Sequence, residues 1–250
     1  MHRDALVAWL DALLETARFR DSSVNGLQVE GADEVQRVAV ATDACIETIE
    51  GALAAGAELL IVHHGLLWGA CEPLRGAFGR RVRAAVRGGL NVYASHLPLD
   101  AHPEVGNNAE LARLLGLQGL RPWGRYREQE IGLCGSLPEP LSRQALVERL
   151  TTVVAGPVRL LPFGPEPLER VAVVSGGAAD LLPQAVAEGL HALVTGEPAH
   201  SAFHVAREGA VSVLFGGHYA TETLGVRALA RRIEREHGLP WVFLDHPTGC

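Results

Sequence analysis

Two hydrophobic patterns alternate along the chain, one with helical spacing and one made of short continuous runs. Apolar residues that fall on one helix face predict amphipathic helices at residues 6–14, 46–53 and 79–87. Short apolar runs predict buried strands at residues 25–31, 35–44, 57–62 and 90–95. The stretch 130–164 follows the same alternation as strand, helix, strand. Strands that alternate with helices predict an α/β fold with a largely parallel sheet.

An internal repeat indicates two similar halves. Residues 37–62 align without a gap on residues 170–195, and 8 of the 26 positions are identical. The alternative is that any two strand–helix–strand units with alanine-rich helices look alike. No flexible linker separates the halves, so we expect two duplicated α/β lobes with mostly parallel sheets that share a cleft. The predicted lobes are residues 1–124 and 125–250.

The composition is that of a globular protein without a membrane segment. The 250 residues carry a formal net charge of −7, and no apolar run is long enough to cross a bilayer. The N-terminal segment does not resemble a signal peptide, and the cysteines form no C-x-x-C pair, so we expect reduced thiols in the cytoplasm. These are Cys45, Cys71, Cys134 and Cys250. The acidic balance disfavours a general nucleic-acid or membrane-surface binder, while a local basic patch stays open.

Two adjacent histidines, His63 and His64, end the apolar run at residues 57–62 and are followed by Gly65. Ligands bind at the carboxyl ends of strands in open α/β sheets, so this pair lies where a site is expected. Adjacent side chains of a regular strand face opposite ways. A shared site therefore requires the chain to leave strand geometry, which Gly65 would permit. The alternative is that each imidazole is an ordinary hydrogen-bonded group at a strand end.

Acidic residues follow two further predicted strands. His218 and Glu222 lie four residues apart at the predicted start of a helix, directly after two glycines. This spacing places an imidazole and a carboxylate on one helix face. Asp100 lies four residues after His96, just beyond another short strand. The alternatives are an exposed ion pair in the first helical turn and a turn-capping role for Asp100.

Three imidazoles and two carboxylates thus lie at predicted strand ends, and they suit a pair of divalent metal ions. The candidate ligands are His63, His64, Asp100, His218 and Glu222. Five ligands overfill one tetrahedral ion, whereas two ions about 3.5–4 Å apart would share them together with a bridging water. Nitrogen and oxygen ligands without thiolate favour Zn, Mn, Fe or Ni.

Three other residues are candidates for proton transfer or for holding the ligands in place. Glu197 aligns with His64 in the internal repeat, and His200 follows it, so both are expected to line the cleft. His96 is expected to hold a ligand in place or to contact substrate. The alternative for Glu197 and His200 is a turn glutamate followed by a helix with one histidine.

Several motifs resemble those of the Nif-three-like family, also called the GTP cyclohydrolase I type 2 family. They occur in order over nearly the whole chain: NGLQVEG, VHHGLLW, HLPLDAHPEVGNNAELARLLG, TGE and GGHYATETLGVRAL. The chain is similar to the short bacterial branch, in which no domain is inserted between the lobes. The resemblance implies a toroidal homohexamer with a dinuclear metal site in each subunit, and the same five residues would be its ligands.

The resemblance also implies a hydrolase, because a GTP cyclohydrolase activity is attached to the family name. In such a reaction a metal-bound hydroxide attacks C8 of the guanine ring of GTP, and Glu197, His96 or His200 would transfer the proton. The alternative is a non-catalytic, ring-shaped metal-binding scaffold or regulatory protein. A nuclease or phosphodiesterase is a third hypothesis, which the acidic net charge disfavours. The expected partners are other copies of the chain and a small-molecule substrate such as a nucleotide.

Overall fold

The computed structural model describes residues 1–70 and 72–250, and its contacts divide the chain into two compact units. Unit 1 consists of Met1–Leu99 and Gly225–His246, and unit 2 consists of Asp100–Leu224 and Pro247–Cys250. Cys71, one of the thiols that the sequence predicts to be reduced, lies outside the described residues.

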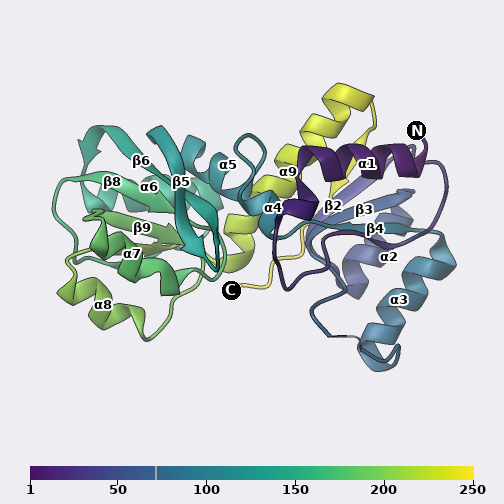
Figure 1. Cartoon of the computed structure of the whole chain (residues 1–250), viewed down its shortest axis with the longest axis horizontal. Helices are drawn as coiled ribbons and strands as arrows, with labels where there is room; N and C mark the ends of the chain where they lie inside the picture. The colour runs from purple at the N-terminus through teal and green to yellow at the C-terminus, as the bar shows by residue number, and fades with distance from the viewer. Residues whose placement is uncertain (71) are drawn as a thin grey trace. The chain divides into compact units, whose positions relative to one another are not determined.

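Unit 1 is built on a mainly parallel sheet (Figure 1). The strand order is β1-β4-β3-β2-β11, in which β1 is antiparallel to β4 and the other neighbours are parallel. The strands are β1 (Gly26–Val29), β2 (Val38–Asp43), β3 (Leu59–His64), β4 (Asn91–Ala94) and β11 (Trp241–Phe243). The helical segments are α1 (Arg3–Leu13), η1 (Thr16–Arg18), α2 (Ile46–Ala54), α3 (Gly76–Gly88) and the later part of α9 (His218–His237).

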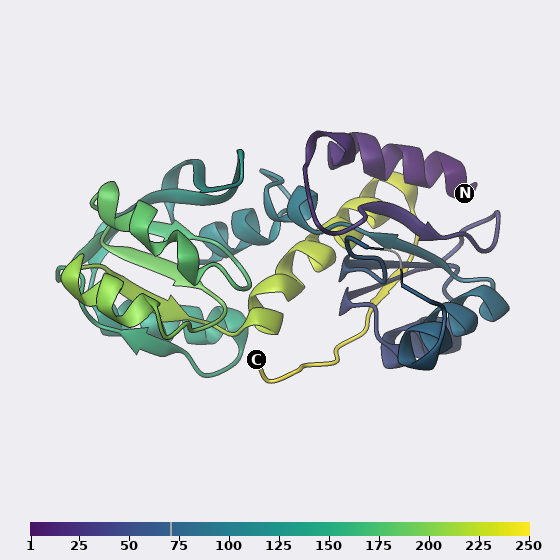
Figure 2. The ribbon, with the colours of Figure 1, turned by 60° about the horizontal axis from the view of Figure 1, so that its bottom comes forward.

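Both faces of this sheet are covered, which explains why its strands read as continuous apolar runs. Leu60 and Val62 point to one face, where they pack with Ile49 of α2 and Phe78 of α3. Tyr93 points to the opposite face, where its hydroxyl lies 2.8 Å from a carboxylate oxygen of Asp11 in α1. Figures 1 and 2 show α2 and α3 on one side of the sheet and α1 on the other.

Unit 2 contains a mixed sheet with the strand order β5-β6-β8-β9-β10-β7. Its central strands β8, β9 and β10 are parallel, whereas β5, β6 and β7 are antiparallel to their neighbours. The strands are β5 (Gln118–Tyr126), β6 (Gln129–Leu141), β7 (Arg159–Leu161), β8 (Leu168–Val173), β9 (Ala192–Thr195) and β10 (Ser212–Phe215). The helical segments are α5 (Asn107–Leu114), α6 (Arg143–Val154), η2 (Ala179–Leu181), α7 (Leu182–Ala187), α8 (Ala202–Glu208) and the start of α9. The short helix α4 (Leu97–Asp100) spans the boundary, with its first three residues in unit 1.

The contacts do not group the chain by a single boundary after residue 124. Strand β5 pairs with β6 of unit 2, and the C-terminal strand β11 returns to pair with β2 of unit 1. The hydrophobic pattern does not predict β5, because most of its residues are exposed and an outer hairpin strand buries few apolar side chains. The α/β class is confirmed, and each sheet contains a run of parallel strands.

The two sheets share a topology, which agrees with the predicted duplication. The order β1-β4-β3-β2 in unit 1 matches the order β7-β10-β9-β8 in unit 2, and each begins with an antiparallel edge strand. Helix α2 in the first copy of the repeat corresponds to η2 and α7 in the second. The carboxyl ends of β3 and β4 are therefore equivalent to those of β9 and β10.

The sequence also predicts that no segment crosses a membrane and that the cysteines are reduced thiols. No helix within residues 1–70 or 72–250 combines the length and the apolar character needed to cross a membrane. Within the same described residues, Cys45, Cys134 and Cys250 are free thiols. Cys134 is buried, whereas the sulfur of Cys45 caps α2 by accepting the backbone N–H of Thr48 at 3.4 Å.

Candidate metal centre

The adjacent histidines end strand β3, which lies between β2 and β4. His63 is fully buried, and its Nδ1 lies 3.0 Å from the carbonyl oxygen of Ser95, just after β4. Nδ1 of His64 lies 2.8 Å from Oδ1 of Asp43, its register partner at the end of β2. The strand continues through both histidines, contrary to the prediction that the chain leaves strand geometry there. The two imidazoles instead contact acceptors on either side of β3, His63 toward the end of β4 and His64 toward β2. Their ring centroids are 4.7 Å apart.

Gly65 allows a close approach of β1 to the loop that follows the histidine pair. A Cβ at this position would collide with the side chains of Gln28 and Ala94. Oε1 of Gln28 accepts the backbone N–H groups of Leu66 at 2.6 Å and Leu67 at 3.2 Å. Strand β1 therefore holds the turn directly after His64.

His96 follows β4 and is held by a buried carboxylate. Its Nδ1 lies 3.0 Å from both carboxylate oxygens of Asp21, whose side chain is only 3% exposed. Asp21 also accepts the side-chain amide of Asn25 and the backbone N–H of Leu97. Burial by itself raises the pKa of Asp21, but the hydrogen bonds from these three groups outweigh it and hold that pKa well below its usual range. Asp21 is therefore ionised at neutral pH and acts only as an acceptor.

These contacts fix which ring nitrogen of each histidine faces the site. A carbonyl oxygen or an ionised carboxylate can only accept a hydrogen bond, so Nδ1 carries the hydrogen in His63, His64 and His96. In the neutral imidazole Nε2 then presents its lone pair, as metal-binding histidines generally require. The three side chains offer ligand atoms that all lie within 4.8 Å of one another. Unit 1 thus carries three oriented imidazoles at one sheet edge.

In unit 2, His218 begins helix α9 and lies between two carboxylates. Its Nδ1 is 2.8 Å from Oε1 of Glu197, and its Nε2 is 3.0 Å from Oε2 of Glu222, one helical turn later. The hydrogen bond to Glu222 raises the pKa of His218 to about 9, with Glu197 adding to the shift and burial opposing it. Glu222 is buried, so the site stabilises positive charge at a buried carboxylate. An imidazole and a carboxylate so placed fit a divalent cation.

Two glycines after β8 leave room for these carboxylates. Gly176 has a φ of +64°, and a Cβ there would collide with Oε1 of Glu222. A Cβ on Gly177 would lie 3.2 Å from Oε2 of Glu197. In the internal repeat Gly176 aligns with Asp43, so the same strand end supplies a carboxylate in unit 1 and space for one in unit 2.

A buried polar network holds Asp100. Its Oδ1 accepts the side-chain amide of Asn107 and the hydroxyl of Ser175, each at 3.0 Å. The side-chain amide of Asn108 donates to the carbonyl oxygens of Asp100 and Ile131, and its own oxygen accepts the backbone N–H of Ser175. The carboxylate is therefore fixed in orientation by α5 and by the end of β8.

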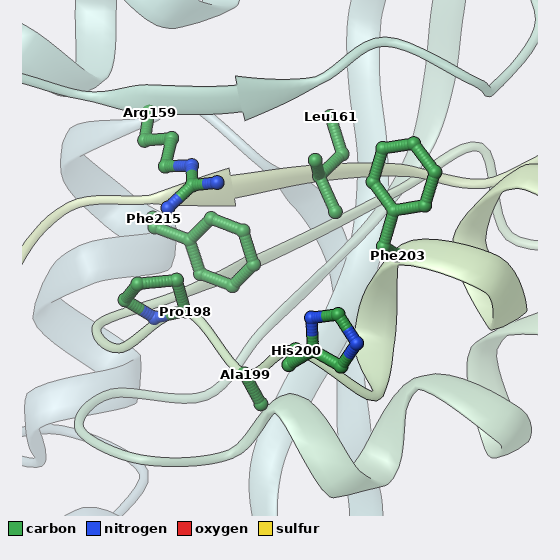
Figure 3. A pocket seen from close by; sticks show the side chains of 7 residues that line it. All are labelled: Arg159, Leu161, Pro198, Ala199, His200, Phe203 and Phe215. Carbon is green, nitrogen blue, oxygen red and sulfur yellow. The ribbon is translucent and has the colours of Figure 1, made fainter.

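Within each unit, the structure brings several of the predicted site residues together. His63 and His64 lie with His96 in unit 1, and His218 and Glu222 lie with Glu197 in unit 2. Asp100 belongs to the network around Ser175 and Asn108. His200 is exposed and lines a separate pocket with Arg159 and Phe203 (Figure 3). Glu197 contacts Nδ1 of His218.

Sequence reasoning missed the residues that orient these groups, namely Asp21, Asp43, Asn107, Asn108 and Ser175. Asp43 carried a usable signal, because it ends a predicted strand next to the strand of His64. Asp21 carried none, since it lies in a loop 75 residues from its partner His96.

Comparisons with known proteins agree over the full chain. Residues 1–248 match the family described as Duf34/NIF3 (NGG1p interacting factor 3). A Deinococcus radiodurans protein named "GTP cyclohydrolase 1 type 2 homolog" is 47% identical over 248 residues, which cover 99% of this chain and 94% of that protein. A Pyrococcus abyssi protein of the same name is 44% identical over 253 residues and covers both chains fully.

Solved structures show the same fold. The structure of TTHA1606 from Thermus thermophilus superposes with a TM-score of 0.93 at 46% identity, and the match covers 100% of each chain. The structure of protein ybgI, described as of unknown function, superposes with a TM-score of 0.94 at 33% identity and the same coverage.

Proposed function

The chain belongs to the Duf34/NIF3 family. We propose that it is a metal-dependent hydrolase whose substrate is a small molecule, a nucleotide whose ring it opens. The proposed metal ligands are the five residues that the sequence predicts, His63, His64, Asp100, His218 and Glu222. They are proposed to hold two divalent ions chosen from Zn, Mn, Fe and Ni. A ring nitrogen of His96 also lies within 4.8 Å of ring nitrogens of the histidine pair, which supports a role for this residue beside the proposed ions and not as one of their ligands.

The observation that carries the proposal is the shared orientation of the imidazoles. Nδ1 of His63, His64, His96 and His218 faces an oxygen acceptor at 2.8–3.0 Å in every case. Metal-binding histidines use the same arrangement, in which the partner at one nitrogen fixes the ring so that the other can bind the ion. Histidines on an ordinary protein surface do not need an oxygen acceptor fixed at Nδ1.

The hydrolase part of the proposal rests on chemistry and on the names of the relatives. Bound divalent cations would acidify water and polarise the electrophilic atom of a substrate. His96 is the best-placed residue to hold or pass a proton at Nε2, because ionised Asp21 fixes its Nδ1 and its side chain is partly exposed. Glu197 would keep the ring of His218 in place. The D. radiodurans and P. abyssi relatives are both named as GTP cyclohydrolase homologues, which makes GTP the first substrate to test.

Metal content tests the proposal directly. Elemental analysis of untagged protein should give near two ions per chain, and His64→Ala and Glu222→Ala should lower that number while the fold is retained. His204→Ala, at an exposed position of α8, is the matched control and should bind as much metal as the unmodified chain. Bound metal near zero after incubation with Zn²⁺, Mn²⁺, Fe²⁺ or Ni²⁺ would contradict the proposal.

Turnover then separates an enzyme from a scaffold. Release of formate from GTP should require the metal, should stop with a chelator and should return when metal is restored. Full metal occupancy without turnover of any nucleotide would favour a non-catalytic metal-binding scaffold. The mass of the same sample in solution tests the proposed homohexamer.

A further inference from the structure

A pocket of about 330 Å³ in unit 2 lies along the strand ends that lead to Glu197 and His218. It is lined by Arg159, Leu161, Pro198, Ala199, His200, Phe203 and Phe215 (Figure 3). Pro198 directly follows Glu197, and Phe215 precedes His218 by three residues. The pocket is therefore built from the same chain segments as the candidate metal ligands of this unit.

The sheet edge forms one wall of the pocket. Strand β7 runs antiparallel to β10, and Arg159 is the register partner of Phe215. Leu161 lies two residues after Arg159, so the alternation of a strand places it on the same face. Phe215 is buried, whereas Arg159 is exposed. The wall thus combines a fixed aromatic ring with a guanidinium at its rim.

Helix α8 and the loop before it form the other wall. The ring of Phe203 packs edge-on against Phe163 with centroids 5.3 Å apart, yet 38% of the residue remains exposed. Figure 3 shows His200 beside Phe203, and Arg159 beside Phe215 at the other end. A partly exposed aromatic ring that a second ring holds in place presents a rigid apolar surface to a ligand.

The charge of the pocket selects the class of ligand. Among residues 1–70 and 72–250, no carboxylate forms an ion pair with Arg159. Its five N–H donors are therefore available to an anionic ligand. A guanidinium binds phosphate or carboxylate groups and also stacks on flat rings. The volume is at the small end of the range for ligand pockets, about 300–1,000 Å³. It suits one flat ring system with one charged substituent.

We propose that this pocket binds the planar ring and an anionic group of the substrate, which makes that substrate a nucleotide-like aromatic anion. Phe203 and Phe215 would contact the ring, Arg159 would bind the anionic group, and His200 would donate or accept a hydrogen bond at the ring edge. The inference rests on the proposed function and deepens it, because the bound molecule would lie along the segments that carry Glu197 and His218.

Binding to metal-free protein tests the pocket without relying on catalysis. GMP, guanosine and inorganic phosphate are titrated by calorimetry into chelator-treated full-length protein. Phe203→Ala should weaken GMP and guanosine by about tenfold each, since stacking on an aromatic side chain contributes that much. Arg159→Gln should weaken GMP by about tenfold and leave guanosine unchanged, because only GMP carries the anion. The matched controls are Arg207→Gln on α8 and Leu120→Ala on β5, both exposed, and they should bind like the unmodified chain.

Each outcome decides for or against the pocket. The inference is overturned if GMP does not bind, or if it binds equally well to Phe203→Ala and Arg159→Gln. It is also overturned if either variant changes the mass in solution, because the groove would then be a contact between copies. Metal-dependent GTP turnover with unchanged KM in both variants would overturn the pocket and keep the proposed function. Variant-sensitive GMP binding without any turnover would keep the pocket and overturn the hydrolase.

Discussion

Replacing Asp43 by alanine removes the acceptor that holds Nδ1 of His64, and its effect on metal affinity can be worked from the structure. The contact is 2.8 Å long, and the side chains of Asp43 and His64 are 35% and 20% exposed. Loss of such a supporting contact costs metal sites about 10–100-fold in affinity. Because solvent screens a carboxylate that is one-third exposed, we expect the lower end, about tenfold or about 1.4 kcal/mol.

The assay is competition between the protein and a chromophoric chelator for Zn²⁺. Asp43→Asn should lose less than Asp43→Ala, since the amide oxygen can still accept the hydrogen on Nδ1. Glu50→Ala, an exposed acid on α2, controls for the loss of one negative charge. Unchanged Zn²⁺ affinity in a folded Asp43→Ala protein would refute the argument that Asp43 prepares His64 for metal.

Three further predictions concern the fold and the room around the site. Gly176→Ala should weaken metal binding at least tenfold because a Cβ would displace Glu222, whereas Gly56→Ala, with a similar φ of +67° but open space around it, should leave metal binding unchanged. Tyr93→Phe should flatten the loss of stability above pH 10. Burial, with Asp11, raises the pKa of Tyr93, so the folded chain keeps a proton that the unfolded chain releases, and stability falls by about 1.4 kcal/mol per pH unit. The measurement is urea unfolding at a series of alkaline pH values, where the chain has no lysine whose titration would obscure that of Tyr93. An equal slope of unfolding free energy against pH in Tyr93→Phe and in the unmodified chain would contradict the prediction. Leu60→Ala, fully buried in β3, should cost about 3 kcal/mol in urea unfolding, and a cost below about 1 kcal/mol would contradict its place in the core.

The elements of the fold could be predicted, and the candidate ligands proposed, because their signals are local. Strand β3 is a continuous apolar run covered on both faces, and the spacing of His218 and Glu222 is a property of a single helical turn. The repeat also predicted that both halves have the same arrangement of strands, which the shared strand order supports.

The supporting residues could not be predicted because their contacts are set by tertiary structure. His96 meets Asp21, and Asp100 meets Ser175, in each case across 75 residues of chain. No spacing rule joins such pairs. The exposed strand β5 was not predicted for a related reason. It forms because it pairs with β6, and it has no continuous buried face that a hydrophobic pattern would show.

Neighbouring parallel strands supply both of the carboxylates that orient His64 and His218. Asp43 ends β2 opposite His64 on β3, and Glu197 follows β9, whose parallel neighbour β10 leads to His218. A slip of one residue would turn every side chain of a strand to the opposite face and separate each pair. An ion that binds only the paired arrangement stabilises it by mass action. Metal binding during folding would then favour the chains whose strands are paired in the native register over those with a shifted register.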